Sequence, residues 1–99
     1  MANYQIELTE EAKEDVYYYD AFERKIIVSG IRDQLSDQPD VETKNRKPLR
    51  ENKLAPWEVR IGKFRVFYKL DETGKTVTVV SVGHKEHNIV LIRGKEVEL

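Results

Sequence analysis

In Trp57–Leu70, WEVRIGKFRVFYKL, two runs of alternating apolar and polar residues flank Gly62-Lys63. Glycine in the first central position suits a two-residue hairpin turn. The register set by that turn places three apolar pairs on one face: Ile61 with Phe64, Val59 with Val66, and Trp57 with Tyr68. A slip of one residue would expose the whole set, so the sequence predicts this register.

The other face of the predicted hairpin is mostly polar and carries Glu58, Arg60, Arg65, Phe67 and Lys69. The register puts Arg60 opposite Arg65, and like charges facing each other across strands are unfavourable. Glu58 can neutralise one of them locally. A bound phosphate can satisfy both, because guanidinium groups hold phosphate through two parallel hydrogen bonds. A solvated, salt-bridged face and an anion site are both compatible with this pattern.

Upstream of the hairpin, the sequence predicts a strand followed by two helices. Residues 4–8 alternate apolar and polar side chains, as a half-buried strand does. Thr9 and Asp20 are suitable N-caps for consecutive helices. We expect the first helix over Glu11–Tyr19 and the end of the second before Pro39.

Downstream, Thr76–Val82 is rich in β-branched residues and predicts a third strand of the meander. His84–Leu99 is ambiguous: Ile89–Ile92 is compatible with a short strand, and Arg93–Leu99 with an edge strand or a frayed end. The predicted order is β-α-α-β-β-β, an antiparallel meander with its helices grouped on one face. Residues 1–99 therefore predict a single α+β domain.

Charge is distributed unevenly, although the net charge is only −1. Residues 1–43 carry four basic and eleven acidic side chains, whereas residues 44–69 carry nine basic and two acidic ones. The proline-containing loop at residues 37–56 contributes Lys44, Arg46, Lys47, Arg50 and Lys53. A positive stripe of this density can bind a polyanion such as RNA. The alternative is that the acidic and basic parts neutralise each other within the fold.

His84 and His87 are the two histidines of the chain. His84 follows Gly83 at a predicted strand end, and an imidazole can move protons near neutral pH. A lone histidine is more often structural, but the expected neighbourhood of arginines favours a working role. His87 is expected at the surface. A metal site built from His84, Glu86 and His87 would lack a recognisable spacing, so we expect no metal.

Several absences narrow the functional class. The chain has no cysteine, which excludes disulfides and thiolate chemistry and suits a reducing cytoplasm. The first residues, MANYQIELTEE, lack the pattern of a signal peptide, and no apolar run is long enough to cross a bilayer, so we expect a cytoplasmic protein without a membrane partner. The glycine-rich phosphate loop, the Rossmann fingerprint and the nucleophile elbow are missing, and no cofactor is expected.

Four segments together resemble the RelE/ParE toxin superfamily: the strand ending in Leu8-Thr9, TKNRKPL at residues 43–49, WEVRIGKFRVFY at residues 57–68, and Val82-Gly83-His84-Lys85. The resemblance covers nearly the whole chain, and the hairpin is its most specific part. It implies a toxin of a type II toxin–antitoxin operon, held inactive by a cognate antitoxin. RelE-like members cut messenger RNA in the ribosomal A site, and ParE-like members inhibit DNA gyrase.

The resemblance also implies roles for individual residues. Arg65 matches the arginine that stabilises charge on the scissile phosphate, Arg60 a basic position on the preceding strand, and Lys85 a position where RelE-like members often have arginine. His84 would be a general acid or base, with the 2′-hydroxyl attacking to leave a 2′,3′-cyclic phosphate. We expect a metal-independent mRNA endonuclease with ribosome and mRNA as partners. The tail lacks the aromatic residue common in these RNases, and Glu58 stands where some members have lysine. These departures favour the alternative of a gyrase inhibitor, which needs no such site. We still expect an RNase, because Arg60, Arg65, His84 and Lys85 together are more than a scaffold requires; an inactive antitoxin-binding module is the third alternative.

Overall fold

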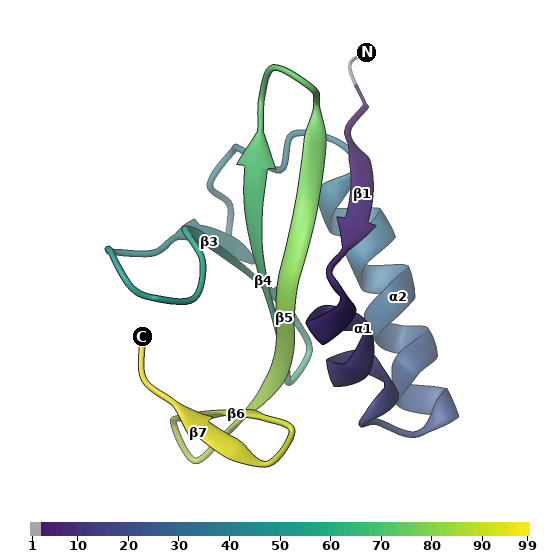
Figure 1. The fold of residues 1–99 in the computed structure, drawn as a ribbon, viewed down its shortest axis with the longest axis vertical. Coiled ribbons are helices and arrows are strands. Elements are labelled where there is room, and N and C mark those ends of the chain that lie inside the picture. Colours follow the sequence, from purple (N-terminus) through teal and green to yellow (C-terminus); the bar gives the residue numbers. More distant parts are fainter. Residues whose placement is uncertain (1–2) are drawn as a thin grey trace.

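In the computed structural model, which describes residues 3–99, two helices cover one face of a single sheet (Figure 1). The elements in chain order are β1 (Gln5–Leu8), α1 (Glu10–Tyr17), α2 (Ala21–Leu35), β2 (Arg46–Pro48), β3 (Trp57–Ile61), β4 (Phe64–Asp71), β5 (Thr76–Glu86), β6 (Ile89–Ile92) and β7 (Lys95–Val97). The sheet order is β2-β3-β4-β5-β6-β7, and β1 pairs with β5 in parallel. The α+β architecture predicted from the sequence is confirmed.

The β3–β4 hairpin has the predicted register. Ile61 lies opposite Phe64, Val59 opposite Val66, and Trp57 opposite Tyr68. Gly62 has a φ of +59°, a backbone conformation that favours glycine, as the predicted turn requires. The three apolar pairs face the helices, and the fully buried Val59, Val66 and Tyr68 form the centre of the core.

Both predicted caps begin the helices. The Thr9 hydroxyl accepts a hydrogen bond from the Ala12 amide at 3.1 Å, and the Asp20 carboxylate accepts one from the Glu23 amide at 2.8 Å. Gly30, which interrupts the apolar pattern of α2, allows that helix to lie against β3. A Cβ atom at this position would lie only 2.5 Å from the Ile61 side chain.

In the C-terminal third, β5 is longer than expected, and the tail takes the strand alternative at both places. β5 continues through Glu86 rather than ending near Val82, because its pairing with β4 extends to Phe64 and His84. The ambiguous tail forms an antiparallel hairpin of β6 and β7, and the loop before β3 contributes the additional short strand β2. Within the described residues, no helix is long and apolar enough to span a bilayer.

Candidate functional site

Arg60, Arg65 and Lys85 lie on the face of the sheet that the helices leave uncovered. Arg60 is opposite Arg65 across β3 and β4, as predicted, and Arg65 is opposite Gly83 on β5. Lys85 lies two residues beyond Gly83, so strand alternation directs its side chain to the same face as Arg65. The sheet thus brings three of the predicted site residues together.

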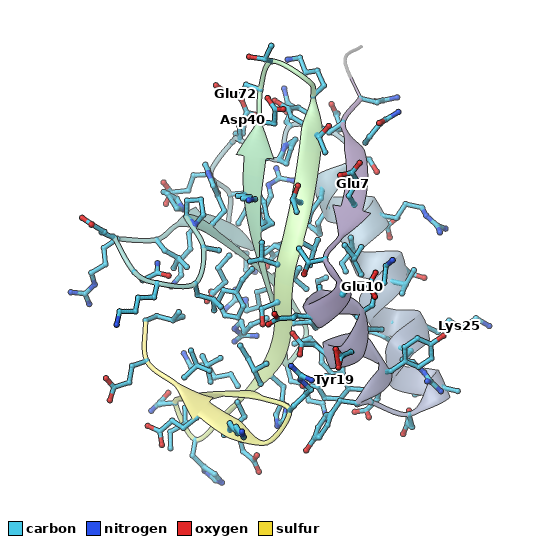
Figure 2. The ribbon with its side chains drawn as sticks, viewed as in Figure 1. Glu7, Glu10, Tyr19, Lys25, Asp40 and Glu72 are labelled. Atoms are coloured by element: carbon cyan, nitrogen blue, oxygen red, sulfur yellow. The ribbon has the colours of Figure 1, made fainter. Side chains whose placement is uncertain are left out.

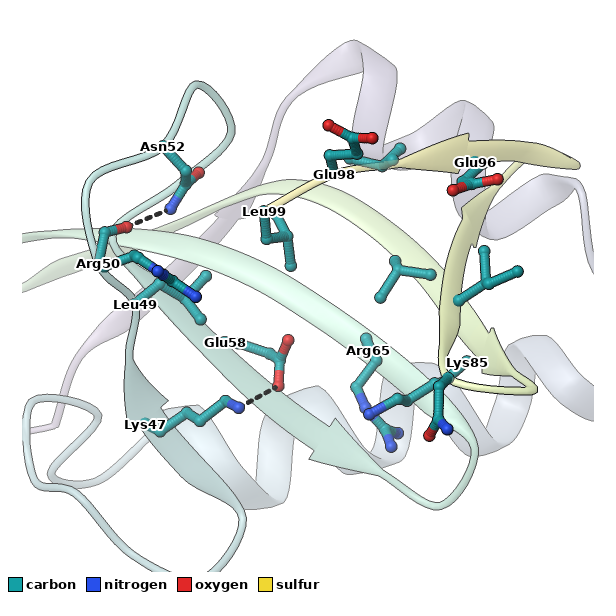
Figure 3. A pocket seen from close by; sticks show the side chains of 14 residues that line it. Lys47, Leu49, Arg50, Asn52, Glu58, Arg65, Lys85, Glu96, Glu98 and Leu99 are labelled. Atoms are coloured by element: carbon teal, nitrogen blue, oxygen red, sulfur yellow. Dashed lines mark hydrogen bonds and ion pairs between the residues drawn. The ribbon is translucent and has the colours of Figure 1, made fainter.

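A pocket of about 520 Å³ is hollowed into this face, and we call it the outer pocket (Figure 3). Its cationic residues are Lys47, Arg50, Arg65 and Lys85. The β6–β7 hairpin and the residues after it form the opposite wall. A smaller hollow of about 170 Å³, the basic cleft, shares Lys47, Glu58, Arg65 and Lys85 with the outer pocket and adds Lys44 and Arg60. The shared residues mark where the two hollows meet.

Arg65 is held in place by backbone carbonyl groups. Its Nη1 atom donates hydrogen bonds to the carbonyl oxygens of Gly62 and Phe64, both at 3.0 Å. Burial lowers the pKa of Arg65, with the like charge of Arg60 acting in the same direction and Glu58 in the opposite one. A guanidinium group keeps its charge despite such a shift. Arg65 is therefore an oriented cation at the junction of the two hollows.

Glu58 is a carboxylate that lies among the cations lining the two hollows. The residue is only 8% exposed, and its Oε2 atom lies 3.9 Å from Lys47 Nζ. It also lines both hollows together with Arg65. A carboxylate in this position offsets the repulsion between Arg60 and Arg65. The sequence predicts only local charge neutralisation by Glu58; its place among the cations of both hollows depends on the tertiary fold.

The predicted basic loop residues divide into two groups. Lys44 and Lys47 line the basic cleft, and the Lys44 carbonyl oxygen accepts a 3.5 Å hydrogen bond from Arg60 Nη2. Arg50 lines the outer pocket. Arg46 instead donates to the carbonyl oxygens of Val41 at 3.1 Å and Gln34 at 2.6 Å, an arrangement that ties the loop to α2. Lys53 lies in the same loop but lines neither hollow.

His84 is not beside the arginines, and that part of the prediction is wrong. It lies opposite Phe64 on the helix-covered face, where its Nδ1 atom is 2.7 Å from the Tyr19 hydroxyl and its Nε2 atom 3.4 Å from Glu86. Burial first, then nearby charged and phenolic groups, raises the pKa of Tyr19 above its ordinary value, so this hydroxyl keeps its proton. The reason for the error is that β5 continues through His84, and neighbouring strand residues point to opposite faces.

Gly83 permits a close approach between β5 and β6. A Cβ atom there would collide with the Leu91 carbonyl oxygen and approach the Ile92 side chain. Glycine therefore lets β6 fold closely over the outer side of β5. The glycine was visible in the sequence, but its role depends on a contact with a residue eight positions later in the chain.

Comparison with known proteins places this architecture in a family. Residues 6–89 match the family model described as the ParE toxin of the type II toxin–antitoxin system, parDE. A toxin–antitoxin complex RelBE2 from Mycobacterium tuberculosis contains a chain that is 26% identical, with a TM-score of 0.75 and coverage of 86% of this chain and 94% of that one. None of the curated proteins matches.

An archaeal RelE–RelB complex from Pyrococcus horikoshii OT3 contains a second similar chain. It is 17% identical, has a TM-score of 0.63, and the alignment covers 83% of this chain and 93% of that one. At this identity the match supports the fold alone. The family match, in contrast, spans most of the sequence, including β3, β4 and β5. The chain therefore belongs to the ParE family of type II toxins, within the RelE/ParE superfamily.

Proposed function

We propose that this toxin is a ribosome-dependent mRNA endonuclease that works without a metal ion. The observation that carries the proposal is the convergence of Arg60, Arg65 and Lys85 around the buried carboxylate of Glu58 in an open hollow. Antitoxin binding alone does not require cations to be concentrated around a carboxylate in this way. A reaction at a phosphodiester uses both kinds of group.

In this proposal the cations bind the scissile phosphate. Arg65, oriented by its two backbone hydrogen bonds, and Lys85 contact the phosphate oxygens, and Arg60 adds positive charge from β3. Charge on those oxygens rises as the 2′-oxygen attacks. Oriented cations stabilise that transition state more than the ground state, which is how they accelerate the reaction.

Glu58 replaces His84 in our assignment of the general base. The 2′-hydroxyl passes its proton to Glu58 as its oxygen bonds to phosphorus. The bond to the 5′-oxygen breaks, and that oxygen takes a proton from water. The products are a 2′,3′-cyclic phosphate and a 5′-hydroxyl end. The support for Glu58 is its position between Lys47 and Arg65, where a substrate phosphate would be held.

The chemistry of the RNA ends tests this proposal. The purified toxin is incubated with translating ribosomes and a defined message, and new 5′ ends are tested for direct labelling by polynucleotide kinase. We expect labelling without prior phosphatase treatment, because the cut leaves a 5′-hydroxyl, and we expect no loss of cutting in EDTA-washed protein assayed beside untreated protein. Cut ends that carry a 5′-phosphate would contradict the mechanism, and an uncut message would contradict the function.

A specific observation also favours inhibition of DNA gyrase as a second candidate. Among the described residues, neither a histidine nor an aromatic side chain lines either hollow. A toxin that blocks gyrase by binding needs neither group. This candidate predicts that a stoichiometric excess of toxin stops supercoiling by purified gyrase while messages stay intact. Unchanged supercoiling would remove it.

We further propose a cognate antitoxin as the partner that silences the toxin, since the 26% identical chain from Mycobacterium tuberculosis belongs to a toxin–antitoxin complex. An antitoxin that covers the basic cleft should contribute acidic side chains there, because the cleft is lined by five cations and one carboxylate. Reversing those antitoxin charges should weaken binding at low salt. An equally tight complex would contradict this assignment of the contact.

A further inference from the structure

The β6–β7 hairpin brings negative charge to the edge of the cationic hollow. Glu96 in β7 and Glu98 just after it line the outer pocket across from Arg65 and Lys85 (Figure 3). Neither carboxylate takes part in an ion pair within 4.0 Å among residues 3–99. They therefore act on the pocket through the electrostatic potential of their negative charges rather than through ion pairs.

These two carboxylates largely cancel the charge of the outer pocket. Its lining contains four cations, Lys47, Arg50, Arg65 and Lys85, against three carboxylates, Glu58, Glu96 and Glu98. The formal charge is thus +1, and it would be +3 without the two carboxylates of the hairpin. The adjoining basic cleft, which the hairpin does not line, has a formal charge of +4. The two carboxylates of the C-terminal segment account for two of the three charges by which the hollows differ.

The hairpin is anchored at its turn and free along its outer strand. In the turn, Arg93 Nε lies 2.8 Å from the buried Asp15 carboxylate, which also accepts hydrogen bonds from the Ser81 hydroxyl at 2.9 Å and the Val82 amide at 3.0 Å. By contrast, β7 pairs only with β6, over three residues. The contacts that anchor the turn to α1 and β5 therefore do not involve β7.

We propose that the segment 95–98 is a built-in acidic cover that competes with polyanions for the outer pocket. An entering nucleic acid strand must displace the cover or turn its carboxylates toward solvent, and the cover thereby lowers the affinity for nucleic acid. The proposal rests on the anion-binding part of the function proposed above. It does not depend on cleavage.

The test measures binding of a fluorescent single-stranded deoxyoligonucleotide, which cannot be cut by 2′-hydroxyl attack. The variant Glu96→Gln/Glu98→Gln is compared with the wild type by anisotropy at low salt. The control, Glu7→Gln/Glu72→Gln, changes net charge equally but at exposed positions near the opposite end of the molecule (Figure 2). We expect the first variant to bind about fivefold more tightly, within a range of about two- to thirtyfold, and the control to stay within about twofold.

Three outcomes would contradict the proposal that segment 95–98 is an acidic cover. Equal gains in both double variants would mean that net charge alone matters. Weaker binding by Glu96→Gln/Glu98→Gln would mean that the carboxylates contact the ligand, for example by accepting hydrogen bonds from base amino groups. If no variant binds the oligonucleotide measurably, there is no polyanion binding with which the carboxylates could compete. A parallel ribosome cleavage assay separates the two proposals. Tighter binding by Glu96→Gln/Glu98→Gln without message cleavage by the toxin would support the acidic cover and contradict the endonuclease. Message cleavage without tighter binding would support the endonuclease and contradict the cover.

Discussion

His84 and Lys85 are neighbours in β5, yet they belong to opposite faces of the sheet with different environments. The face that His84 shares with Phe64 is closed by the helices. Tyr19 lies against His84 there, and the Tyr68 hydroxyl donates to the Pro39 carbonyl oxygen at 2.8 Å. The face that Lys85 shares with Arg65 is open and carries like charges close together. From this comparison we propose that the closed face stabilises the fold and that the open face carries the chemistry.

The largest expected effect is on the open face, from removing the proposed base. Glu58→Gln keeps the shape of the side chain but cannot take a proton. We expect cleavage in the ribosome assay to fall by about 10²- to 10⁴-fold with the fold retained, as judged by circular dichroism. Glu51→Gln, in the neighbouring loop and outside both hollows, is the matched control and should cut like the wild type. Full activity of Glu58→Gln would exclude Glu58 as the base.

Arg65→Ala should lower the cleavage rate by about 10²- to 10³-fold, because an oriented cation at the phosphate is lost. Lys69→Ala is its control on the same strand and face, since Lys69 is exposed and lines neither hollow. Both proteins should melt within a few degrees of the wild type. Comparable losses of activity in the two variants would mean that general positive charge, not the site, is responsible.

A contrasting effect, on stability rather than on cleavage, should come from replacing Asp15. Its side chain joins α1 to β5 and to Arg93. Asp15→Ala leaves the Ser81 hydroxyl, the Val82 amide and Arg93 without their acceptor. We expect the free energy of unfolding to fall by about 3 kcal/mol in urea titrations. Glu14→Ala, at the exposed neighbouring position, should cost less than about 0.5 kcal/mol. A small change in Asp15→Ala would show that the buried cluster contributes little.

The smallest effect should come from His84→Ala. It removes one hydrogen-bonded contact with Tyr19 and should lower the free energy of unfolding by about 1 to 2 kcal/mol. Cleavage per folded molecule should stay within about threefold of the wild type, because the imidazole faces away from the hollows. If fully folded His84→Ala cut message 100-fold more slowly or worse, the chemistry could not be assigned to the open face alone.

The parts of this structure that were predicted correctly depend on short-range patterns. The turn at Gly62-Lys63 and the flanking alternation fix the register that opposes Arg60 to Arg65, and Thr9 and Asp20 mark both helix starts. All of these signals act within a few residues along the chain. They were therefore readable without knowledge of the tertiary structure.

The errors and omissions depend on contacts between distant segments. The end of β5 is set by its pairing with β4 and β6, so the face that His84 occupies could not be read from its neighbours alone. The place of Glu96 and Glu98 in the outer pocket follows from the close approach of β6 at Gly83. Within a strand, adjacent side chains such as those of His84 and Lys85 point to opposite faces of the sheet. Whether this rule applies to them depends on where β5 ends.

The most direct test of the central claim compares Arg65→Ala with His84→Ala in one experiment. Each is induced without antitoxin in a bacterial host, and the 5′ ends of cellular RNA are mapped within minutes, with protein levels matched by immunoblot. If the open face carries the chemistry, new cuts appear inside translated messages with the wild type and with His84→Ala, and none with Arg65→Ala. Cuts that persist in Arg65→Ala and vanish in His84→Ala would contradict the assignment of the chemistry to the open face.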